Sequence, residues 1–264
     1  MKLLWTVSNW KRTGPVEPSL DLAAAKQERG HDVTVAVGRA PDQTGEGARE
    51  AARARDLALI DVGAKLSKHR SPLRDLMDGR KLRRWVRQSE PDAIVTTLRN
   101  DHRLMMRAAA RVATPVVARL WYGDGTTAID RQEVAALRGT DVITALGDAG
   151  RRQLESYGVP SGAILECQPP LDVTGLRELA AAGDDPREAL GVPPETFLFG
   201  IVARMQTHRR FELLWEALAA LKQSGPPFHL VVVGRGTNME SVAVRPVADF
   251  GLDDVVSFAG YLRG

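Results

Sequence analysis

Two arginines in the second half of the chain stand where they could bind a phosphorylated ligand. Arg204 follows the apolar run 197–203, and Arg209 lies just before a predicted helix at 210–222. Guanidinium groups beside a helix N-terminus can hold a diphosphate and neutralise a departing phosphate, because the side chains and the helix end both favour negative charge. The alternative is a pair of solvated arginines at a helix start, which is a common surface arrangement.

A glycine and a histidine in the first half could lie near a bound ligand. Gly14 belongs to the turn before a predicted helix at 17–29. Without a side chain it would let the backbone approach a phosphate or a sugar, or it could belong to an ordinary turn. His102 stands at the start of the predicted helix 101–112, for which Asn100 or Asp101 is the expected cap. A lone histidine there is more often a cap or a surface residue than a catalytic group.

Two aromatic residues and a carboxylate follow the predicted strand 115–120. Trp121 and Tyr122 could stack on the face of a sugar, and Asp124 could accept hydrogen bonds from sugar hydroxyls. The simpler interpretation is a loop with a partly buried aromatic pair. An indole cannot act as a base, so this segment names no catalytic residue.

Strand-like and helix-like segments alternate almost from end to end and must position these residues. The expected strands are 2–7, 31–37, 59–62, 93–97, 115–120, 142–145 and 163–166, then 197–203, 229–233 and 255–258. The expected helices are 17–29, 47–57, 73–88, 101–112, 148–157, 210–222 and 239–249. Such alternation predicts an α/β fold with doubly wound parallel sheets, whose ligands bind at the carboxyl ends of the strands.

A segment rich in proline, glycine and aspartate, 168–194, divides these elements into two groups. We therefore expect two domains in tandem, 1–170 and 195–264, joined by a linker at 171–194.

Composition excludes several classes of protein. Hydrophobic residues make up 44% and charged residues 26%, which excludes a disordered chain. The net charge of only +3, despite a pI near 9.2, argues against a nucleic-acid partner. The single cysteine, Cys167, cannot form an internal disulfide, and no His or Cys spacing predicts a metal site. No segment resembles a signal peptide or a membrane span, so a cytoplasmic location is expected.

Two stretches resemble the donor lobe of the retaining glycosyltransferases of family GT4, which have the two-lobed GT-B architecture. In the first, 200–218, Arg204 fits the family's arginine, Arg209 falls on its lysine position and Arg210 on its glycine position. In the second, 229–262, Gly234 falls in the family's Val-Gly-x-Gly loop. Segments of the first lobe also match in order, at 20–37, 91–95, 140–160 and 168–172.

The resemblance implies two Rossmann-like lobes, an acceptor-side lobe at 1–170 and a nucleotide-sugar lobe at 195–264. It implies transfer of a hexose, with retention, from a nucleoside diphosphate sugar to a glycan, lipid or small-molecule hydroxyl, with no further cofactor and no metal. The implied donor-binding residues are Arg204, Arg209, Arg210, Gly14 and Gly234. The acceptor-side candidates are His102, Trp121, Tyr122 and Asp124, and the catalytic residue is not assigned.

The chain departs from the family pattern in two places. Trp121 stands where some members have a histidine. The sequence also stops at Gly264, before the family's E-x7-E loop, so we expect an incomplete second lobe with an exposed apolar patch or open sheet edge and poor catalysis. A non-catalytic module that binds a nucleotide or glycan therefore remains an alternative. A sugar-nucleotide 2-epimerase is another, although no cluster of carboxylates and histidines supports it.

A basic run at 80–87 has two interpretations. Its cations surround Leu82, Trp85 and Val86. They could hold the protein to the inner face of an anionic membrane as a peripheral contact. The structural interpretation, which we favour, is an amphipathic helix with its apolar stripe on the sheet and its charges in water.

Overall fold

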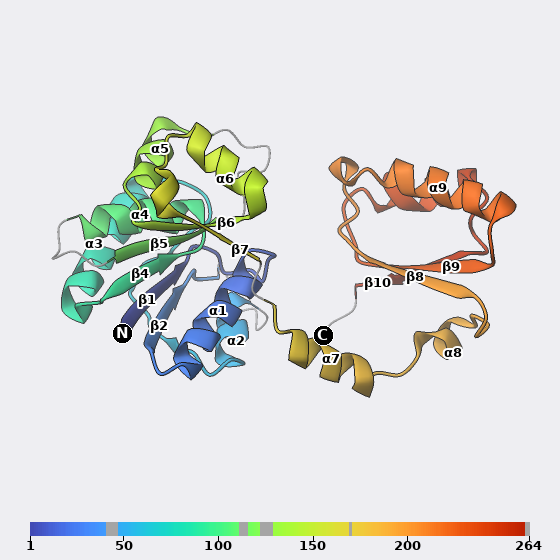
Figure 1. The fold of residues 1–264 in the computed structure, drawn as a ribbon, viewed down its shortest axis with the longest axis horizontal. Helices are drawn as coiled ribbons and strands as arrows, with labels where there is room; N and C mark the ends of the chain where they lie inside the picture. The colour runs from blue at the N-terminus through green and yellow to red at the C-terminus, as the bar shows by residue number, and fades with distance from the viewer. Residues whose placement is uncertain (41–46, 111–115, 122–128, 169–170, 262–264) are drawn as a thin grey trace. The chain divides into compact units, whose positions relative to one another are not determined.

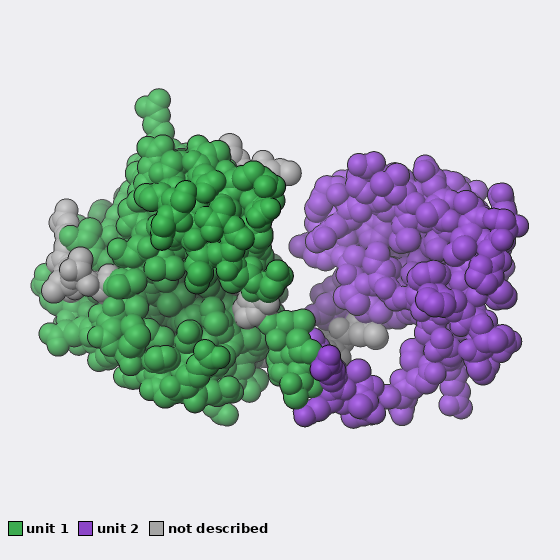
Figure 2. Space-filling model, viewed as in Figure 1, with its two compact units in different colours: residues 1–175 green, residues 176–264 purple. Residues whose placement is uncertain are grey.

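The computed structural model describes residues 1–40, 47–110, 116–121, 129–168 and 171–261. The chain forms two compact units, Met1–Gly175 and Leu176–Gly264 (Figure 2). The predicted domain bounds, 1–170, 171–194 and 195–264, stay a prediction.

The first unit contains a seven-stranded parallel sheet with the order β3-β2-β1-β4-β5-β6-β7 (Figure 1). Its strands are β1 (Lys2–Val7), β2 (Asp32–Val37), β3 (Ala58–Leu59), β4 (Ala93–Thr96), β5 (Val116–Trp121), β6 (Val142–Leu146) and β7 (Ile164–Cys167). The chain runs outward from β1 to β3 and then returns to β4 on the other side of β1. The carboxyl ends of β1 and β4 therefore form the switch point where such sheets bind ligands.

Helices cover both faces of this sheet. They are α1 (Val16–Glu28), α2 (Ala48–Arg53), α3 (Pro72–Ser89), α4 (Arg99–Ala109), α5 (Arg131–Arg138) and α6 (Gly147–Ser156). Side chains of β1 alternate between the faces: Trp5 packs with α1 and α2, whereas Leu4 packs with α3 and α4. Burial on both faces explains why apolar residues of this strand point to both sides of the sheet.

The second unit contains a three-stranded parallel sheet with the order β10-β9-β8. The strands are β8 (Phe197–Val202), β9 (Phe228–Val233) and β10 (Val256–Gly260), and the helices are α8 (Pro186–Leu190), α9 (Phe211–Ser224) and α10 (Arg245–Asp249). The helix α7 (Val173–Ala182) spans the boundary between the two units. Figure 1 shows α9 on one face of the sheet. The sequence therefore predicted the α/β class with two parallel sheets correctly.

Apolar side chains are exposed on this second sheet, at its edge strand β8. Val202 is 84% exposed and Phe197 is 59% exposed. The expected exposed apolar patch or open sheet edge at the C-terminal side of this unit stays a prediction, and the exposed side chains described here lie on β8, the edge opposite β10.

The predicted helix 239–249 forms, but part of it is π-helical rather than α-helical. A π-helical segment, Glu240–Val244, precedes the short α10. Proline has no N–H, so the carbonyl of Val242 lacks its α-helical partner. The indole N–H of buried Trp215 donates to that carbonyl at 2.8 Å instead.

Other expectations for the elements need correction. The helix α5 was not predicted, and α7 and α8 occupy the segment expected to be a linker. The helix α4 begins at Arg99, with Leu98 at the N-cap position, so neither Asn100 nor Asp101 caps it. Asp101 stands three residues further along, where its carboxylate accepts from the N–H groups of Thr97 and Leu98.

No helix among the described residues is both long enough and apolar enough to cross a membrane.

Candidate functional site

Backbone hydrogen bonds connect the ends of β8, β9 and β10 and the loops that follow them. Gly234 donates its N–H to the carbonyl of Gly260 at 2.7 Å, and the N–H of Met205 reaches the carbonyl of Arg235 at 3.3 Å. A Cβ atom on Gly234 would overlap the Ala203 carbonyl oxygen. The glycines of the Gly-x-Gly loop therefore allow close backbone contact between neighbouring strand ends. We call the loops that follow β8, β9 and β10, at the carboxyl edge of the second sheet, the platform.

The three predicted donor-binding arginines lie on this platform, between β8 and α9. Arg204 is exposed next to Met205, whose side chain is fully buried and anchors the loop. Arg209 ends a single 3₁₀ turn, and Arg210 then adopts a left-handed conformation at the N-cap of α9. All three side chains are exposed. The structure thus brings Arg204, Arg209 and Arg210 together in one strand-to-helix loop.

The three arginines differ in their ion pairs. Arg210 pairs with Glu212 at 2.7 Å. The N–H of Glu212 itself and the Arg210 side chain both lower the pKa of the Glu212 carboxyl. In the described part of the chain, Arg204 and Arg209 form no ion pair. They are the arginines best able to take up a new anion.

Arg235 is a fourth cation on this platform, and sequence reasoning did not name it. It lies between the two glycines of the loop, and its guanidinium stands 4.5 Å from the centre of the Tyr261 ring. Tyr261 follows β10, so the contact joins neighbouring strand ends. The sequence did contain a signal for Arg235, because it is the middle residue of the Gly-x-Gly pattern. A side chain at that position must point away from the packed backbones of the two glycines.

Gly14 lies in the first unit, in the loop after β1. The buried Asn9 holds this loop by accepting from the N–H of Lys11 at 3.1 Å and donating to the Thr13 hydroxyl at 3.3 Å. Gly14 has no positive φ, and a Cβ atom added there would meet nothing within 4 Å. The fold itself therefore does not require glycine at this position.

A buried carboxylate joins the ends of β1 and β4 at the switch point. The hydroxyl of Ser8 donates to Asp101 at 3.2 Å and accepts from the Asp101 N–H at 3.1 Å. Burial raises the pKa of Asp101 to about 6, against the effect of these hydrogen bonds and of Arg119. Asp101 is a positioning residue here, since it fixes the start of the Gly14 loop to α4.

His102 is buried, with 2% of its surface exposed. Its Nδ1 lies 2.9 Å from the Thr96 hydroxyl and its Nε2 lies 3.0 Å from the Thr140 hydroxyl. Burial is the main cause that lowers its pKa well below the usual value. The ring is thus a neutral core group rather than a cap or surface residue, and an acceptor-side role for it stays a prediction.

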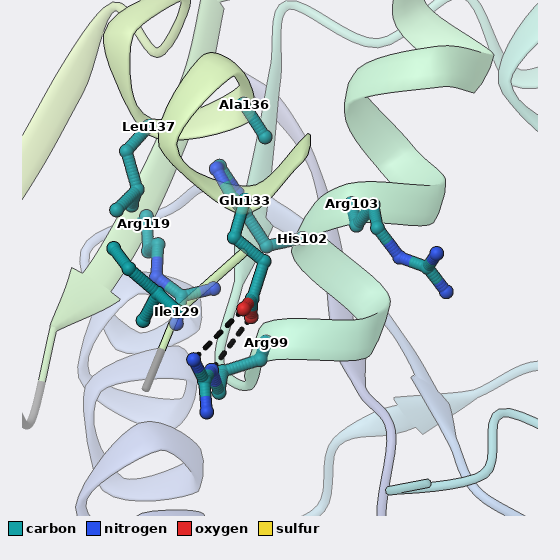
Figure 3. Close-up of a pocket in the computed structure, with 8 residues that line it drawn as sticks. All are labelled: Arg99, His102, Arg103, Arg119, Ile129, Glu133, Ala136 and Leu137. Carbon is teal, nitrogen blue, oxygen red and sulfur yellow. Dashed lines mark hydrogen bonds and ion pairs between the residues drawn. The ribbon is translucent and has the colours of Figure 1, made fainter. Parts of the chain in front are cut away.

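A small pocket lies between α4 and α5, with Arg119 of β5 also in its lining (Figure 3). Arg99 lines the pocket and pairs with Glu133 through two hydrogen bonds of 2.6 and 2.8 Å. The lining residues are Arg99, His102, Arg103, Arg119, Ile129, Glu133, Ala136 and Leu137. Trp121 ends β5, whereas Tyr122 and Asp124 lie outside the described residues.

No cluster of histidine, cysteine or carboxylate side chains that could hold a metal ion occurs among the described residues.

The sequence matches the model of Glycosyltransferase Family 4 over residues 19–173. This match spans more than half of the chain, and the chain belongs to that family. No curated protein matches the sequence significantly.

Solved structures show the same two-lobed GT-B fold at low sequence identity. The structure of HepE from Anabaena in complex with UDP has a TM-score of 0.72 and 16% identity, over 99% of this chain and 70% of HepE. A glycosyltransferase from Rickettsia africae has a TM-score of 0.73 and 16% identity, over 99% and 68%. A UDP-GlcNAc 2-epimerase from Neisseria meningitidis is also similar, with a TM-score of 0.64 and 12% identity, over 100% and 73%.

Proposed function

We propose that this glycosyltransferase takes a hexose from a nucleoside diphosphate sugar and transfers it, with retention, to a hydroxyl group. The acceptor is a glycan, a lipid or a small molecule. The observation that carries this proposal is the exposed arginine loop between β8 and α9, held on a platform of packed backbones. A diphosphate needs concentrated positive charge at a fixed place, and this loop supplies it.

Arg204 and Arg209 contact the diphosphate in this proposal and stabilise the charge that develops on the leaving phosphate. Their lack of ion pairs among the described residues supports these roles. Arg210 shares its charge with Glu212 and contributes less. The backbone of Gly234 borders the donor in this proposal. Gly14 has no side chain, so the loop of the first unit can approach the donor closely.

The acceptor binds on the first unit, over residues 1–170, in the same proposal. The acceptor-side candidates are His102 in α4 and Trp121 at the end of β5, together with Tyr122 and Asp124. Because His102 is buried, its contribution is to hold Thr96 and Thr140 in place. The domain 195–264 holds the donor, and 171–194 connects the two. The expected location is the cytoplasm, and no metal or further cofactor takes part.

UDP-sugars are the first donors to test, because HepE has been solved with UDP and with UDP-glucose. Isothermal titration calorimetry with UDP, GDP and ADP measures the diphosphate site directly. A thermal-shift screen of sugar nucleotides then identifies the sugar, since a ligand that binds only the folded state raises the melting temperature. Failure of all three nucleotides to bind would refute the proposed donor site.

The epimerase alternative rests on the likeness to the Neisseria enzyme. Product analysis separates the two reactions, because transfer releases the nucleoside diphosphate whereas epimerisation keeps the sugar nucleotide intact. A non-catalytic module would bind the nucleotide and give neither product.

A further inference from the structure

Trp10 lies in the loop after β1 and belongs to no hydrophobic cluster among the described residues. The other tryptophans whose side chains the structure describes are core residues: Trp5, Trp85 and Trp215. Trp10 is instead partly exposed. An indole is a large apolar group, and its position outside every described core indicates that it contacts a ligand.

The topology places Trp10 at the ligand-binding edge of the first sheet. It stands three residues after Val7, the last residue of β1. In the strand order β3-β2-β1-β4-β5-β6-β7, the carboxyl end of β1 borders the switch point. Trp10 is therefore an aromatic side chain at the place where such sheets bind their ligands.

Two close contacts hold the backbone of this loop. A Cβ atom on Gly38, which follows β2, would lie 2.9 Å from the carbonyl carbon of Asn9. A Cβ atom on Gly47 would lie 2.6 Å from the Trp10 carbonyl oxygen, which also accepts the Ala48 N–H at 2.8 Å. Because glycine permits these approaches, the backbone that carries the indole is fixed.

Lys11 places a positive charge beside the indole. Its Nζ lies 5.0 Å from the centre of the Trp10 ring, within the range of a cation–π contact. Lys11 is exposed and forms no ion pair in the part of the chain that the structure describes. The neighbouring Arg12, by contrast, pairs with Glu17, which also binds Arg55. Lys11 is thus available to a bound anion.

The residues next to Trp10 in the loop are polar. Asn9 precedes it, and Lys11, Arg12 and Thr13 follow it. An acyl chain needs a contiguous apolar surface, which one indole with polar neighbours does not provide. A sugar ring fits better, because C–H groups on its face pack against an aromatic ring while its hydroxyls and charged groups meet the polar neighbours.

We propose that Trp10 and Lys11 bind an acidic sugar of the acceptor. The sugar ring stacks on the Trp10 indole, and a carboxylate or phosphate group on that sugar pairs with the Lys11 ammonium. Among the acceptor classes named above, this favours a negatively charged glycan over a lipid tail or a neutral molecule. The inference rests on the proposed function, because it takes the first unit as the acceptor side.

Saturation-transfer NMR tests the proposal with the full chain and three sugars that differ only at carbon 6. They are glucose, glucuronate and glucose 6-phosphate. We expect at least one of the two anionic sugars to bind about fivefold more tightly than glucose, and added salt to reduce this preference because exposed charges are screened. The tighter of the two shows whether the anionic group is a carboxylate or a phosphate.

Substitutions at the two residues separate stacking from charge. Trp10→Ala and Trp10→Leu should each weaken binding of all three sugars about fivefold, because neither side chain has an aromatic face. Trp10→Phe should keep most of the affinity. Lys11→Gln should remove the preference for anionic sugars and leave the affinity for glucose unchanged, whereas Lys11→Arg should keep the preference.

Matched substitutions elsewhere serve as controls. Trp85→Phe changes a tryptophan that is 6% exposed in the core. Lys26→Gln removes a lysine from the last turn of α1, at the opposite edge of the sheet. Both variants should bind the three sugars like the unmodified chain. Urea denaturation checks that the Trp10 variants are folded, and Trp10→Leu keeps the test open if Trp10→Ala is not.

Three outcomes would overturn the inference. They are equal binding of glucose and both anionic sugars, unchanged binding in Trp10→Leu, or loss of the anionic preference in Lys26→Gln as in Lys11→Gln. Calorimetry with UDP tests the donor site of the second unit separately. Absence of UDP binding would refute the donor site alone, whereas UDP binding without a preference for acidic sugars would refute this inference alone.

Discussion

Gly234 lies so close to Ala203 that a Cβ atom at Gly234 would overlap the Ala203 carbonyl oxygen. Gly234 also has a φ of 142°, which residues with side chains rarely adopt. This contact joins the ends of β8 and β9, and therefore the loop of Arg204 to the loop of Arg235. The proposed donor platform depends on it.

Gly234→Ala should destabilise the second unit. The overlap and the backbone conformation together should cost about 2–4 kcal/mol of unfolding free energy. Gly200→Ala is the matched control, since a Cβ atom on Gly200 in β8 meets nothing within 4 Å and its φ is not positive. Urea denaturation of both variants measures the difference, and equal stabilities would contradict the proposed role of Gly234.

Arg209→Ala should reduce transfer without affecting the fold. Loss of one charge-stabilising donor typically costs about 2–4 kcal/mol of transition-state stabilisation. We expect kcat/KM for sugar transfer to fall accordingly and the affinity for the nucleoside diphosphate to fall as well. Arg245→Ala, on the exposed side of α10, is the control. Turnover that is the same in both variants would remove Arg209 from the donor site.

Gly14→Ala separates a ligand-facing glycine from an ordinary turn. The added methyl group meets open space in the fold, so the stability should change by less than about 0.5 kcal/mol or rise slightly. If the backbone at Gly14 approaches the donor, the same methyl group should weaken sugar-nucleotide binding. Calorimetry measures that affinity, and an unchanged value would leave Gly14 as an ordinary turn residue.

Asp101 and His102 should oppose each other in the pH dependence of stability. The pKa of Asp101 is raised to about 6 in the folded state. Acidification from pH 7 to pH 5 therefore protonates Asp101 in the folded state, whereas Asp101 in the unfolded chain stays ionised. This difference stabilises the fold on acidification. The pKa of His102 is lowered by burial, so over the same range only the unfolded chain gains a proton there, which destabilises the fold.

Two variants separate these contributions. Relative to the unmodified chain, Asp101→Asn should lose stability on acidification from pH 7 to pH 5, whereas His102→Gln should gain it, each on the order of 1–3 kcal/mol. Urea denaturation at both pH values measures the change. The carboxyls of Asp61 and Asp130, whose pKa values are lowered, act below this range. Parallel pH profiles for all three proteins would contradict the assignment.

Local patterns in the sequence predicted most of the elements. The run 2–7 is apolar on both faces and forms β1 as expected. The missed helix α5 also had a local signal, because Asp130 accepts the N–H groups of Gln132 and Glu133 and Glu133 returns the bond. That Asp-x-x-Glu capping box is visible in the sequence, but the helix has only eight residues, of which Leu137 is the one that is buried.

The burial and the neighbours of the site residues were decided by tertiary structure. His102 resembles a surface residue in the sequence, yet its ring lies between the hydroxyls of Thr96 on β4 and of Thr140, which is 38 residues further along the chain. Arg235 meets Tyr261 because two strands end side by side. Sequence periodicity follows from the repeat of a single helix or strand, so it predicts that element and its apolar face. Which side chains then meet across elements depends on packing between segments far apart in the sequence, and that packing is present only in the folded chain.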